Sequence, residues 1–304
     1  MAGKVSKSPS RLRTIRRLLL AWYRSFARPL PWRKTRDPYR ILISEVMLQQ
    51  TQVNRVSVHY RRFIRKFPTL RSLSQASTAT VLKSWRGLGY NNRAVRLRNL
   101  AREVVVTMGG RLPRTADALK TLPGIGRYTA GAIACFAHGQ RVPVVDTNIQ
   151  RVLSRLFPGA RCIIETWELA ERILPSRNAY AWNQALMELG ALICVSASPS
   201  CSHCPLKSVC PSAFTVRPVR RKLSSKEPGR DGTPNRIYRG RVIEALRNLD
   251  GRHSISSERL GKHVKAHFAA RDRAWFESLL LGLERDRLIR TSIRAGHRIV
   301  SFAE

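Results

Sequence analysis

Residues 122–148 (LPGIGRYTAGAIACFAHGQRVPVVDTN) limit the possible folds most, because they combine a tight glycine turn, a helical pattern and an acid after an apolar run. Pro123 ends the preceding helical pattern, while Gly124 and Gly126 leave the backbone free to adopt positive φ and to approach another molecule. A helix is predicted from Arg127. Backbone N–H groups at its N-terminus, with the charge of Arg127, would form a phosphate site, although glycines that only permit close packing leave the same pattern.

Asp146 follows the short apolar run at residues 142–145 and precedes a second helical pattern at residues 149–157. An aspartate in this place is most often the N-cap of the helix that follows. A cap and a chemical role are compatible, since one side chain can serve both. The sequence therefore predicts a helix start at Asp146 and leaves a catalytic role open.

The charge of the chain indicates a polyanionic partner. Its 304 residues include 56 Lys and Arg against 19 Asp and Glu, a formal net charge of +37. Nucleic acid is the natural partner, although a ribosomal or histone-like binder would show the same balance. No apolar run reaches the roughly 18 residues needed to cross a bilayer, and the N-terminus lacks a secretory pattern, so a cytoplasmic protein without a membrane partner is expected.

A second acid is expected in apolar surroundings. The helix predicted after Pro38 reads RILISEVMLQQTQV and places Glu45 among isoleucine, leucine, valine and methionine. Burial disfavours the charged form of a carboxyl group, which raises its pKa and suits a proton donor near neutral pH. The alternative is a glutamate on the solvent face of an amphipathic helix.

A glycine-interrupted turn occupies residues 85–90 (WRGLGY) and is expected to expose Leu88 and Tyr90. An exposed aromatic residue on a turn, next to Arg93 and the arginines that follow, suits stacking into opened DNA. A tyrosine that simply anchors the loop is the alternative.

Four cysteines, Cys194, Cys201, Cys204 and Cys210, follow the pattern C-x6-C-x2-C-x5-C. One loop with unequal gaps suits an iron–sulfur cluster, whereas zinc commonly uses paired short spacings and is the alternative. Disulfides are disfavoured in a cytoplasmic chain. Cys135 and Cys162 lie outside the pattern and are expected to be ordinary thiols.

These motifs resemble those of the helix-hairpin-helix DNA glycosylase superfamily. LPGIGRYTAGAI followed by VVDTN is similar to its hairpin and catalytic Asp, the cysteine spacing matches its [4Fe–4S] loop, and SEVMLQQTQV is similar to the acid-bearing segment of MutY-type adenine DNA glycosylases. The resemblance covers residues 19–211. It implies a mainly α, two-lobed fold with a cluster loop, in which residues 38–146 form a six-helix barrel lobe and residues 11–37 and 147–216 a cluster lobe.

The resemblance also implies a reaction, the hydrolytic removal of adenine mispaired with guanine or 8-oxoguanine in base excision repair. Glu45 would protonate the extruded base while an ionised Asp146 faces the oxocarbenium-like sugar, which requires opposite pKa shifts. Tyr128 stands where strand-cleaving relatives carry a Schiff-base lysine, and a phenol cannot form a Schiff base. A monofunctional enzyme that leaves an abasic site is therefore expected.

The resemblance implies further roles in binding double-stranded DNA with a mismatch or an oxidised guanine. The chain is expected to act as a nucleoid-associated monomer. Asn148 would orient the two carboxylates. The adenine pocket would be lined by Trp32, Arg33, Leu48 and Glu188, the gap and opposing base would be probed by Gln50, Thr51, Leu88 and Tyr90, and the DNA phosphate would be bound by Gly124, Gly126 and Arg127.

Two other functions stay open. Thr147 stands where adenine enzymes usually have glycine, and together with Tyr128 it favours a thymine or uracil mismatch glycosylase on the same scaffold. A DNA-binding protein without catalysis is the other, which the joint presence of Glu45 and Asp146 disfavours.

The C-terminal sequence departs from many adenine DNA glycosylases, because it has neither the length nor the motifs of their Nudix-like domain. We expect residues 1–10 to be a disordered basic tail and residues 217–235 to be a linker. Residues 236–304 show three helical patterns, at 237–249, 257–267 and 271–286, and a β-like stretch at 288–302. This order predicts a winged-helix-like DNA-binding domain, with a small packing domain as the alternative.

Overall fold

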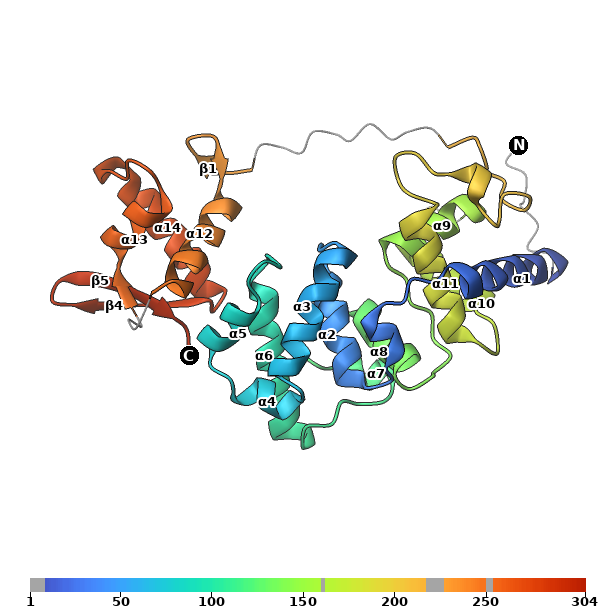
Figure 1. The fold of residues 1–304 in the computed structure, drawn as a ribbon, viewed down its shortest axis with the longest axis horizontal. Helices are drawn as coiled ribbons and strands as arrows, with labels where there is room; N and C mark the ends of the chain where they lie inside the picture. The colour runs from blue at the N-terminus through green and yellow to red at the C-terminus, as the bar shows by residue number, and fades with distance from the viewer. Residues whose placement is uncertain (1–8, 160–161, 217–226, 250–253) are drawn as a thin grey trace. The chain divides into compact units, whose positions relative to one another are not determined.

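The computed structural model describes residues 9–159, 162–216, 227–249 and 254–304, and is mainly helical, as predicted (Figure 1). The chain folds into two compact units: Met1–Glu45 with Leu112–Lys222, and Val46–Arg111 with Leu223–Glu304. The lobe boundaries expected from the sequence stay a prediction. The expected disordered tail lies outside the described residues up to residue 8, as do residues 217–226 of the expected linker.

The first unit is built from helices and two short 3-10 turns. Helix α2, Pro38–Leu48, belongs to it as far as Glu45. The other elements are α1 (Pro9–Phe26), η1 (Pro31–Lys34), α7 (Ala116–Lys120), α8 (Arg127–Phe136), α9 (Thr147–Leu156), α10 (Ile163–Ile173), α11 (Ala179–Leu192) and η2 (Cys201–His203).

Close backbone packing fixes the middle of this unit. A Cβ added at Gly131 of α8 would lie 2.9 Å from the carbonyl oxygen of Pro143, so only glycine lets α8 approach the apolar run that leads to Asp146. Asn183 of α11 holds the same run, because its Oδ1 accepts the backbone N–H of Val144 at 3.2 Å. The packing of α8 and α11 thereby sets where Asp146 begins α9.

The second unit starts with the end of α2 and with four helices, α3 (Val53–Lys66), α4 (Leu70–Gln75), α5 (Thr78–Ser84) and α6 (Asn92–Met108). Thr69 and Ser77 cap α4 and α5 with their side chains, as serine and threonine commonly do. Phe63 and Trp85, both fully buried, meet edge to face with ring centroids 5.6 Å apart. Trp85 stands directly before the glycine turn and anchors its entry in this core.

The same unit contains the C-terminal domain, in which a short hairpin, β1 (Gly229–Arg230) and β2 (Thr233–Pro234), precedes α12 (Asn235–Arg247). There follow β3 (Ser254–Ser256), α13 (Ser257–Val264), η3 (Ala270–Asp272), α14 (Arg273–Arg285), β4 (Ile289–Arg294) and β5 (His297–Phe302). The antiparallel sheet has the order β3-β5-β4. Three helices and this sheet form the predicted winged-helix-like arrangement, in which β3 had not been foreseen.

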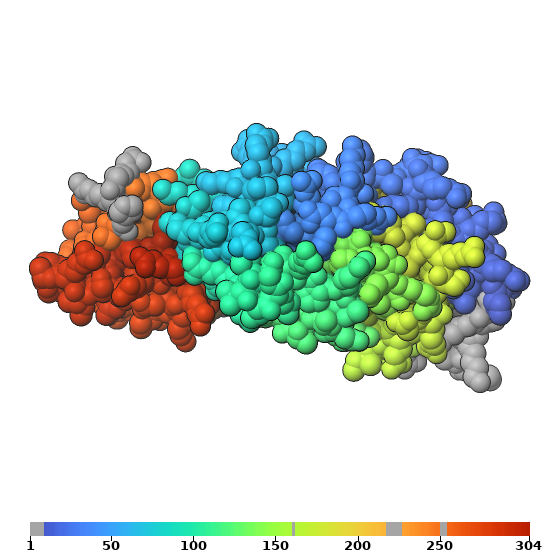
Figure 2. Space-filling model, turned by 90° about the horizontal axis from the view of Figure 1, so that it is seen from below, coloured from blue at the N-terminus to red at the C-terminus, as the bar shows by residue number. Residues whose placement is uncertain are grey.

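The C-terminal domain packs around the buried side chains of Val242, Phe276, Leu280 and Val300. Its first helix, α12, also packs against α5 in the same unit, where the red and orange segments adjoin the teal ones (Figures 1 and 2). Within the described residues, no helix is both long enough and apolar enough to span a bilayer.

Candidate active site

Glu45 is buried in the first unit and is bonded to the helix that follows the glycine hairpin. The residue is 5% exposed, and its Oε2 accepts a hydrogen bond of 2.6 Å from the hydroxyl of Tyr128. Ile41 and Leu42 of the same helix are buried as well. The expectation of a carboxyl group in apolar surroundings is therefore confirmed, and the solvent-facing alternative is wrong.

Burial raises the pKa of Glu45 from 4.5 to about 7. The hydrogen bond from Tyr128 acts in the opposite direction, the negative charge of Asp146 raises the pKa further, and the positive charge of Arg33 lowers it. The desolvation effect is the largest of these. A carboxyl group with this pKa is protonated in a large fraction of molecules at neutral pH and is able to donate a proton.

Asp146 is the N-cap of α9, as the sequence predicted. Its Oδ1 accepts the backbone N–H of Ile149 at 2.7 Å, and its Oδ2 accepts from Nδ2 of Asn148 at 2.8 Å. Both carboxylate oxygens are thus held by donors that favour the charged form. The two carboxyl groups are near enough for the charge of Asp146 to raise the pKa of Glu45.

The expected opposite shifts of the two pKa values are wrong in one respect. Burial also raises the pKa of Asp146, although the hydrogen bonds from Ile149 and Asn148 and the charge of Arg151 lower it. The hydrogen-bond donors around Asp146 outnumber the single donor to Glu45. The two carboxyl groups differ in their hydrogen-bond donors, while burial acts on both.

Glu188 forms ion pairs with two arginines, Arg28 and Arg33. Glu188, with 1% of its side chain exposed, accepts bonds of 2.7 and 2.8 Å from Arg28 and one of 2.8 Å from Arg33. These partners outweigh burial and lower the pKa of Glu188 to about 2. Glu188 therefore holds Arg33 in place, and Arg33 acts on Glu45 through its charge. The neighbouring Trp32 is buried, at 7% exposure.

The glycine hairpin between α7 and α8 has the open backbone expected of a phosphate site. Gly124 has a φ of +79°, Gly126 is the N-cap of α8, and a Cβ at either position would meet no atom within 4 Å. The guanidinium of Arg127 lies over the ring of Trp167, 4.0 Å from its centroid, in a cation–π contact. Arg127 remains exposed at the helix start but is held against Trp167, a contact that the sequence did not indicate.

In the second unit, one arginine joins two of the predicted recognition segments. Arg93, 8% exposed, donates through Nη1 to the carbonyl oxygens of Val46 and Met47, at 2.8 and 3.0 Å, and of Gln49, and through Nη2 to Thr51 Oγ1 at 3.0 Å. Its Nη2 also donates to the carbonyl oxygens of Leu88 and Gly89, at 3.1 and 3.2 Å. The end of α2 and the glycine turn are therefore fixed to one another.

Within these segments the side chains divide into exposed and buried. Tyr90 is 54% exposed with a φ of +45°, and Gln50 is exposed with a φ of +55°. Leu48 is half-buried. Leu88 is only 3% exposed, so the expectation that it is presented to solvent is wrong: the turn directs its side chain into the core while its carbonyl oxygen bonds Arg93.

The four predicted cluster ligands, Cys194, Cys201, Cys204 and Cys210, line one pocket of the first unit, together with Arg155 and Lys207. Among the described residues, no three His, Cys, Asp or Glu side chains are grouped closely enough to hold a single metal ion. Zinc requires sulfur atoms at about 2.3 Å from one ion. Four thiols from one loop that line a common pocket are a donor set that can hold an iron–sulfur cluster, and zinc stays the alternative.

A hydrogen-bonded chain runs from Asp146 to the cysteine loop. Asn148 donates to Asp146, and its Oδ1 accepts from Nη2 of Arg151 at 2.7 Å; Nε of Arg151 donates to the carbonyl oxygen of Cys194 at 2.7 Å. A Cβ added at Gly190 of α11 would lie 2.7 Å from Cβ of Asn148, so glycine is required for this approach. Asn148 thus positions Asp146 from a support that begins at the cysteine loop.

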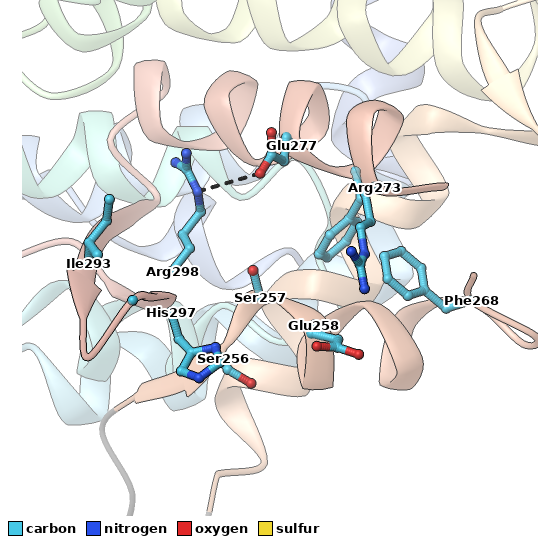
Figure 3. Close-up of a pocket in the computed structure, with 11 residues that line it drawn as sticks. Ser256, Ser257, Glu258, Phe268, Arg273, Glu277, Ile293, His297 and Arg298 are labelled. Atoms are coloured by element: carbon cyan, nitrogen blue, oxygen red, sulfur yellow. Dashed lines mark ion pairs between the residues drawn. The ribbon is translucent and has the colours of Figure 1, made fainter. Parts of the chain in front are cut away.

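A broader pocket lies in the C-terminal domain, between the start of α13, helix α14 and the β4–β5 turn (Figure 3). Its charges are mixed, since Arg273 and Arg298 are accompanied by Glu258 and Glu277, and Arg298 Nε lies 3.8 Å from Glu277 Oε1. It has neither the buried carboxyl pair nor the glycine hairpin of the first unit. The site around Glu45 is therefore the candidate active site.

Sequence comparison gives the family. The model of the HhH-GPD superfamily of base excision DNA repair proteins matches residues 43–174. Adenine DNA glycosylase of Mycolicibacterium smegmatis is 39% identical over 273 residues, which cover 87% of this chain and 90% of that protein. The chain belongs to the adenine DNA glycosylase family of this superfamily.

Other relatives of the family are longer. The adenine DNA glycosylase of Rattus norvegicus is 46% identical over 210 residues, or 64% of this chain. The match spans 41% of the length of the rat protein, so the chain covers less than half of this relative.

Solved structures confirm the helix-hairpin-helix glycosylase fold. A thermostable thymine-DNA glycosylase superposes with a TM-score of 0.65 at 33% identity, covering 68% of this chain and 98% of that one. An endonuclease III in a non-covalent complex with DNA superposes with a TM-score of 0.59 at 26% identity, covering 67% of this chain and 97% of that one.

Sequence reasoning named Arg93 only as a charge beside Tyr90, and it missed three other arginines that organise these sites, Arg28, Arg151 and Arg155. The last donates to Sγ of Cys194 at 3.2 Å and to the carbonyl oxygens of Val195 and Ser196. In a chain with 56 basic residues, an arginine carries little information by itself. Arg151 and Arg155 are four residues apart and therefore share one face of α9, which was the available signal.

Proposed function

We propose that the protein is a monofunctional DNA glycosylase that removes adenine mispaired with guanine or 8-oxoguanine by hydrolysing its N-glycosidic bond. The observation that carries this proposal is the buried Glu45, with a pKa of about 7, beside the N-capping Asp146. The relatives that match most of this chain are adenine DNA glycosylases, which supports adenine as the base removed.

In the proposed reaction the two carboxyl groups act on opposite parts of one extruded nucleotide. Glu45 gives its proton to the leaving base, and Asp146, ionised, stabilises positive charge as it develops on the sugar. Asn148 fixes the orientation of Asp146. Tyr128 holds Glu45 and, as a phenol, offers no amine for a Schiff base, so the product is an abasic site.

Recognition is proposed to use the remaining predicted residues. The hairpin of Gly124, Gly126 and Arg127 binds a strand phosphate, and Tyr90 enters the space left by the extruded base while Gln50 and Thr51 contact the opposing base. Trp32, Arg33 and Leu48 line the base pocket, with Arg33 held by Glu188. The formal charge of +37 and the DNA complex of the endonuclease III relative support a double-stranded DNA partner.

The C-terminal domain is proposed to bind duplex DNA beside the lesion. Arg290, Arg294 and His297 share one face of the β4–β5 hairpin, because Arg294 pairs with His297 in the register and Arg290 is four residues from Arg294. All three are exposed. This face carries no acidic residue in either strand, unlike the mixed pocket of Figure 3, and is suited to phosphate contacts.

The cysteine loop is proposed to hold a [4Fe–4S] cluster through Cys194, Cys201, Cys204 and Cys210. The cluster would serve as a structural support for the loop and for the arginines that contact it. Arg151 connects this loop with Asn148, and Arg155 donates to Sγ of Cys194.

A thymine or uracil mismatch glycosylase is the second candidate, favoured by the structural match to a thymine-DNA glycosylase and by Thr147 after Asp146. The full chain should be incubated with duplexes that hold A·8-oxoG, A·G, T·G or U·G pairs and then treated with alkali. We expect cleavage at adenine only, dependent on alkali, with no borohydride trapping. The matched control is Glu45→Gln, which should be inactive.

Cleavage at T·G or U·G alone would support the second candidate, and cleavage of none would support a DNA-binding protein without catalysis. Strand breaks without alkali, together with trapping, would show that the enzyme is not monofunctional.

A further inference from the structure

A buried arginine of α12 connects the C-terminal domain with the glycine turn of the same unit. Arg247 has 7% of its side chain exposed. Its Nε donates to the carbonyl oxygen of Leu82 at 3.1 Å, and its Nη2 donates to Oδ1 of Asn91 at 2.8 Å. Glu244, one turn earlier, accepts from Nη1 of Arg247 at 3.1 Å. The guanidinium is therefore fixed from its own helix and from both sides of the turn.

These contacts bracket residues 87–90. Leu82 lies near the end of α5, and Asn91 is the N-cap of α6. The side chain of Asn91 makes no capping hydrogen bond and accepts from Arg247 instead. Arg86 reaches α12 as well: it pairs with Glu244 and donates to Oδ1 of Asn248 at 3.0 Å. Both flanks of the turn are consequently held by one short stretch of α12.

The turn is of a kind that needs external support. Gly87, Gly89 and Tyr90 have φ values of +87°, +70° and +45°, and for tyrosine this left-handed conformation is costly. Such a conformation persists where the surrounding structure determines it. Arg93 and the Trp85 Nε1–H hold the inner carbonyl oxygens, while the α12 contacts hold the flanks. Tyr90 is therefore exposed to solvent on a loop whose inner carbonyl oxygens and whose two flanks are all held by hydrogen bonds.

We propose that α12 braces the Gly87–Tyr90 turn, with Arg247 as the positioning residue, so that the C-terminal domain takes part in mismatch recognition in addition to any contact of its own with DNA. The use of the turn in recognition rests on the proposed function. The brace itself is a property of the DNA-free protein and can be tested without activity.

The first test is hydrogen–deuterium exchange of the full chain without DNA, comparing wild type with Arg247→Met. We expect the amides of residues 86–91 to exchange about tenfold faster, the factor that corresponds to one buried hydrogen bond to a charged group. Peptides from α8 and α9 should exchange as in wild type. The matched control is Arg236→Met, which removes an arginine of the same helix whose side chain is 62% exposed and pairs with Glu227.

Unchanged exchange at residues 86–91 would overturn the brace, and so would an increase of equal size throughout α5 and α6, which would indicate ordinary packing. If Arg247→Met does not fold, Asn91→Ala removes the partner instead and leaves Arg247 in place. Arg247→Lys retains the charge but not the forked geometry of the guanidinium. It should therefore restore the slow exchange of residues 86–91 only in part.

The second test measures binding to duplexes with an A·8-oxoG pair or a normal pair. Arg247→Met should reduce the ratio of the two affinities by about tenfold, because a loosened Tyr90 contributes less to the mismatch complex. The pH dependence of base removal should stay that of wild type, since the Glu45 site is intact. Faster exchange with an unchanged affinity ratio would refute the role in recognition, and the absence of any base removal by wild type would bear on the proposed function alone.

Discussion

The hydroxyl of Tyr128 lies 2.6 Å from Oε2 of Glu45, so the residue that replaces the Schiff-base lysine of strand-cleaving relatives is a hydrogen-bond donor to the proposed acid. A phenol offers no amine for a Schiff base, and the same phenol adjusts the pKa of Glu45. The donor stabilises the carboxylate form and keeps the pKa of Glu45 lower than burial alone would set it.

Tyr128→Phe should move the alkaline limb of the pH–rate profile upward. Removal of the hydrogen bond leaves the charged form of Glu45 less stable, so its pKa rises and the acid stays protonated to higher pH. The shift should be up to about one pH unit. Single-turnover rates of adenine removal across pH 5 to 9 would measure it. Tyr238→Phe, whose hydroxyl bonds Arg230 in the C-terminal domain, is the control. A shift to lower pH would contradict the assignment.

Glu45→Gln should change how stability depends on pH. The pKa of Glu45 is about 7 in the folded chain against 4.5 in the reference state, so the folded state retains a proton that the unfolded chain loses between these values. Wild type therefore loses stability as pH rises through this window, by up to about 3 kcal/mol.

The glutamine variant lacks this loss. The free energy of unfolding of the variant minus that of wild type should therefore increase between pH 4.5 and pH 8. Urea denaturation at several pH values would show the difference. Glu171→Gln, at an exposed ion pair with Arg141, should show no such gain. Parallel curves for wild type and Glu45→Gln would mean that Glu45 is not desolvated.

Substitutions of Asp146 should separate the cap from the chemistry. Asn still accepts the backbone N–H of Ile149 but replaces the oxygen that accepts from Nδ2 of Asn148 with a second donor, so Asp146→Asn should lose about 1 kcal/mol of stability while the single-turnover rate falls at least about 100-fold. Asp146→Ala loses both, with a further destabilisation of about 1 kcal/mol. Thermal unfolding and rates would be measured for both. An active Asn variant would assign Asp146 to folding alone.

Gly190→Ala should disturb Asp146 indirectly. The added methyl group would lie 2.7 Å from Cβ of Asn148 and 3.0 Å from its carbonyl oxygen, so α9 and α11 must separate. We expect a destabilisation of about 1–3 kcal/mol and a slower reaction. Gly240→Ala, in α12 with no atom within 4 Å of its added Cβ, should instead be neutral or stabilise by up to about 1 kcal/mol. Equal effects of the two substitutions in thermal unfolding would refute the close-contact explanation.

Cys201→Ser should prevent assembly of the cluster. Protein purified without oxygen should contain iron and sulfide, and the serine variant should lose both. Cys162→Ser, which changes an exposed thiol at the start of α10, should retain them. Zinc in wild type in place of iron, measured by elemental analysis, would show that the alternative metal is correct.

The sequence predicted those features whose signal is local. Asp146 was expected as a cap because it stands between an apolar run and a helical pattern, and Glu45 was expected to be buried because its helical neighbours are apolar. Leu88 was misjudged, since a glycine turn indicates exposure in general but does not say which side chain points inward. Short helices of the C-terminal domain were located to within a few residues, while β3 is too short to leave a pattern.

Features that depend on distant partners left no such signal. Glu188 was expected to line the base pocket, but its partners Arg28 and Arg33 are about 160 and 155 positions away, and only the fold brings them to it. The same holds for Arg247, 156 positions from Asn91. Long-range ion pairs in an arginine-rich chain depend on tertiary packing and cannot be inferred from residue type.

The double engagement of Asp146 limits what can replace it. Asparagine satisfies the start of α9 but is neutral, whereas glutamate retains the negative charge but is one methylene longer and reaches the amide of Ile149 poorly. Two requirements therefore limit which residues can replace Asp146: an acceptor for the first turn of α9 and a negative charge. Under the proposed mechanism, a chain with asparagine at position 146 would keep the start of α9 and lose the charge that faces the sugar.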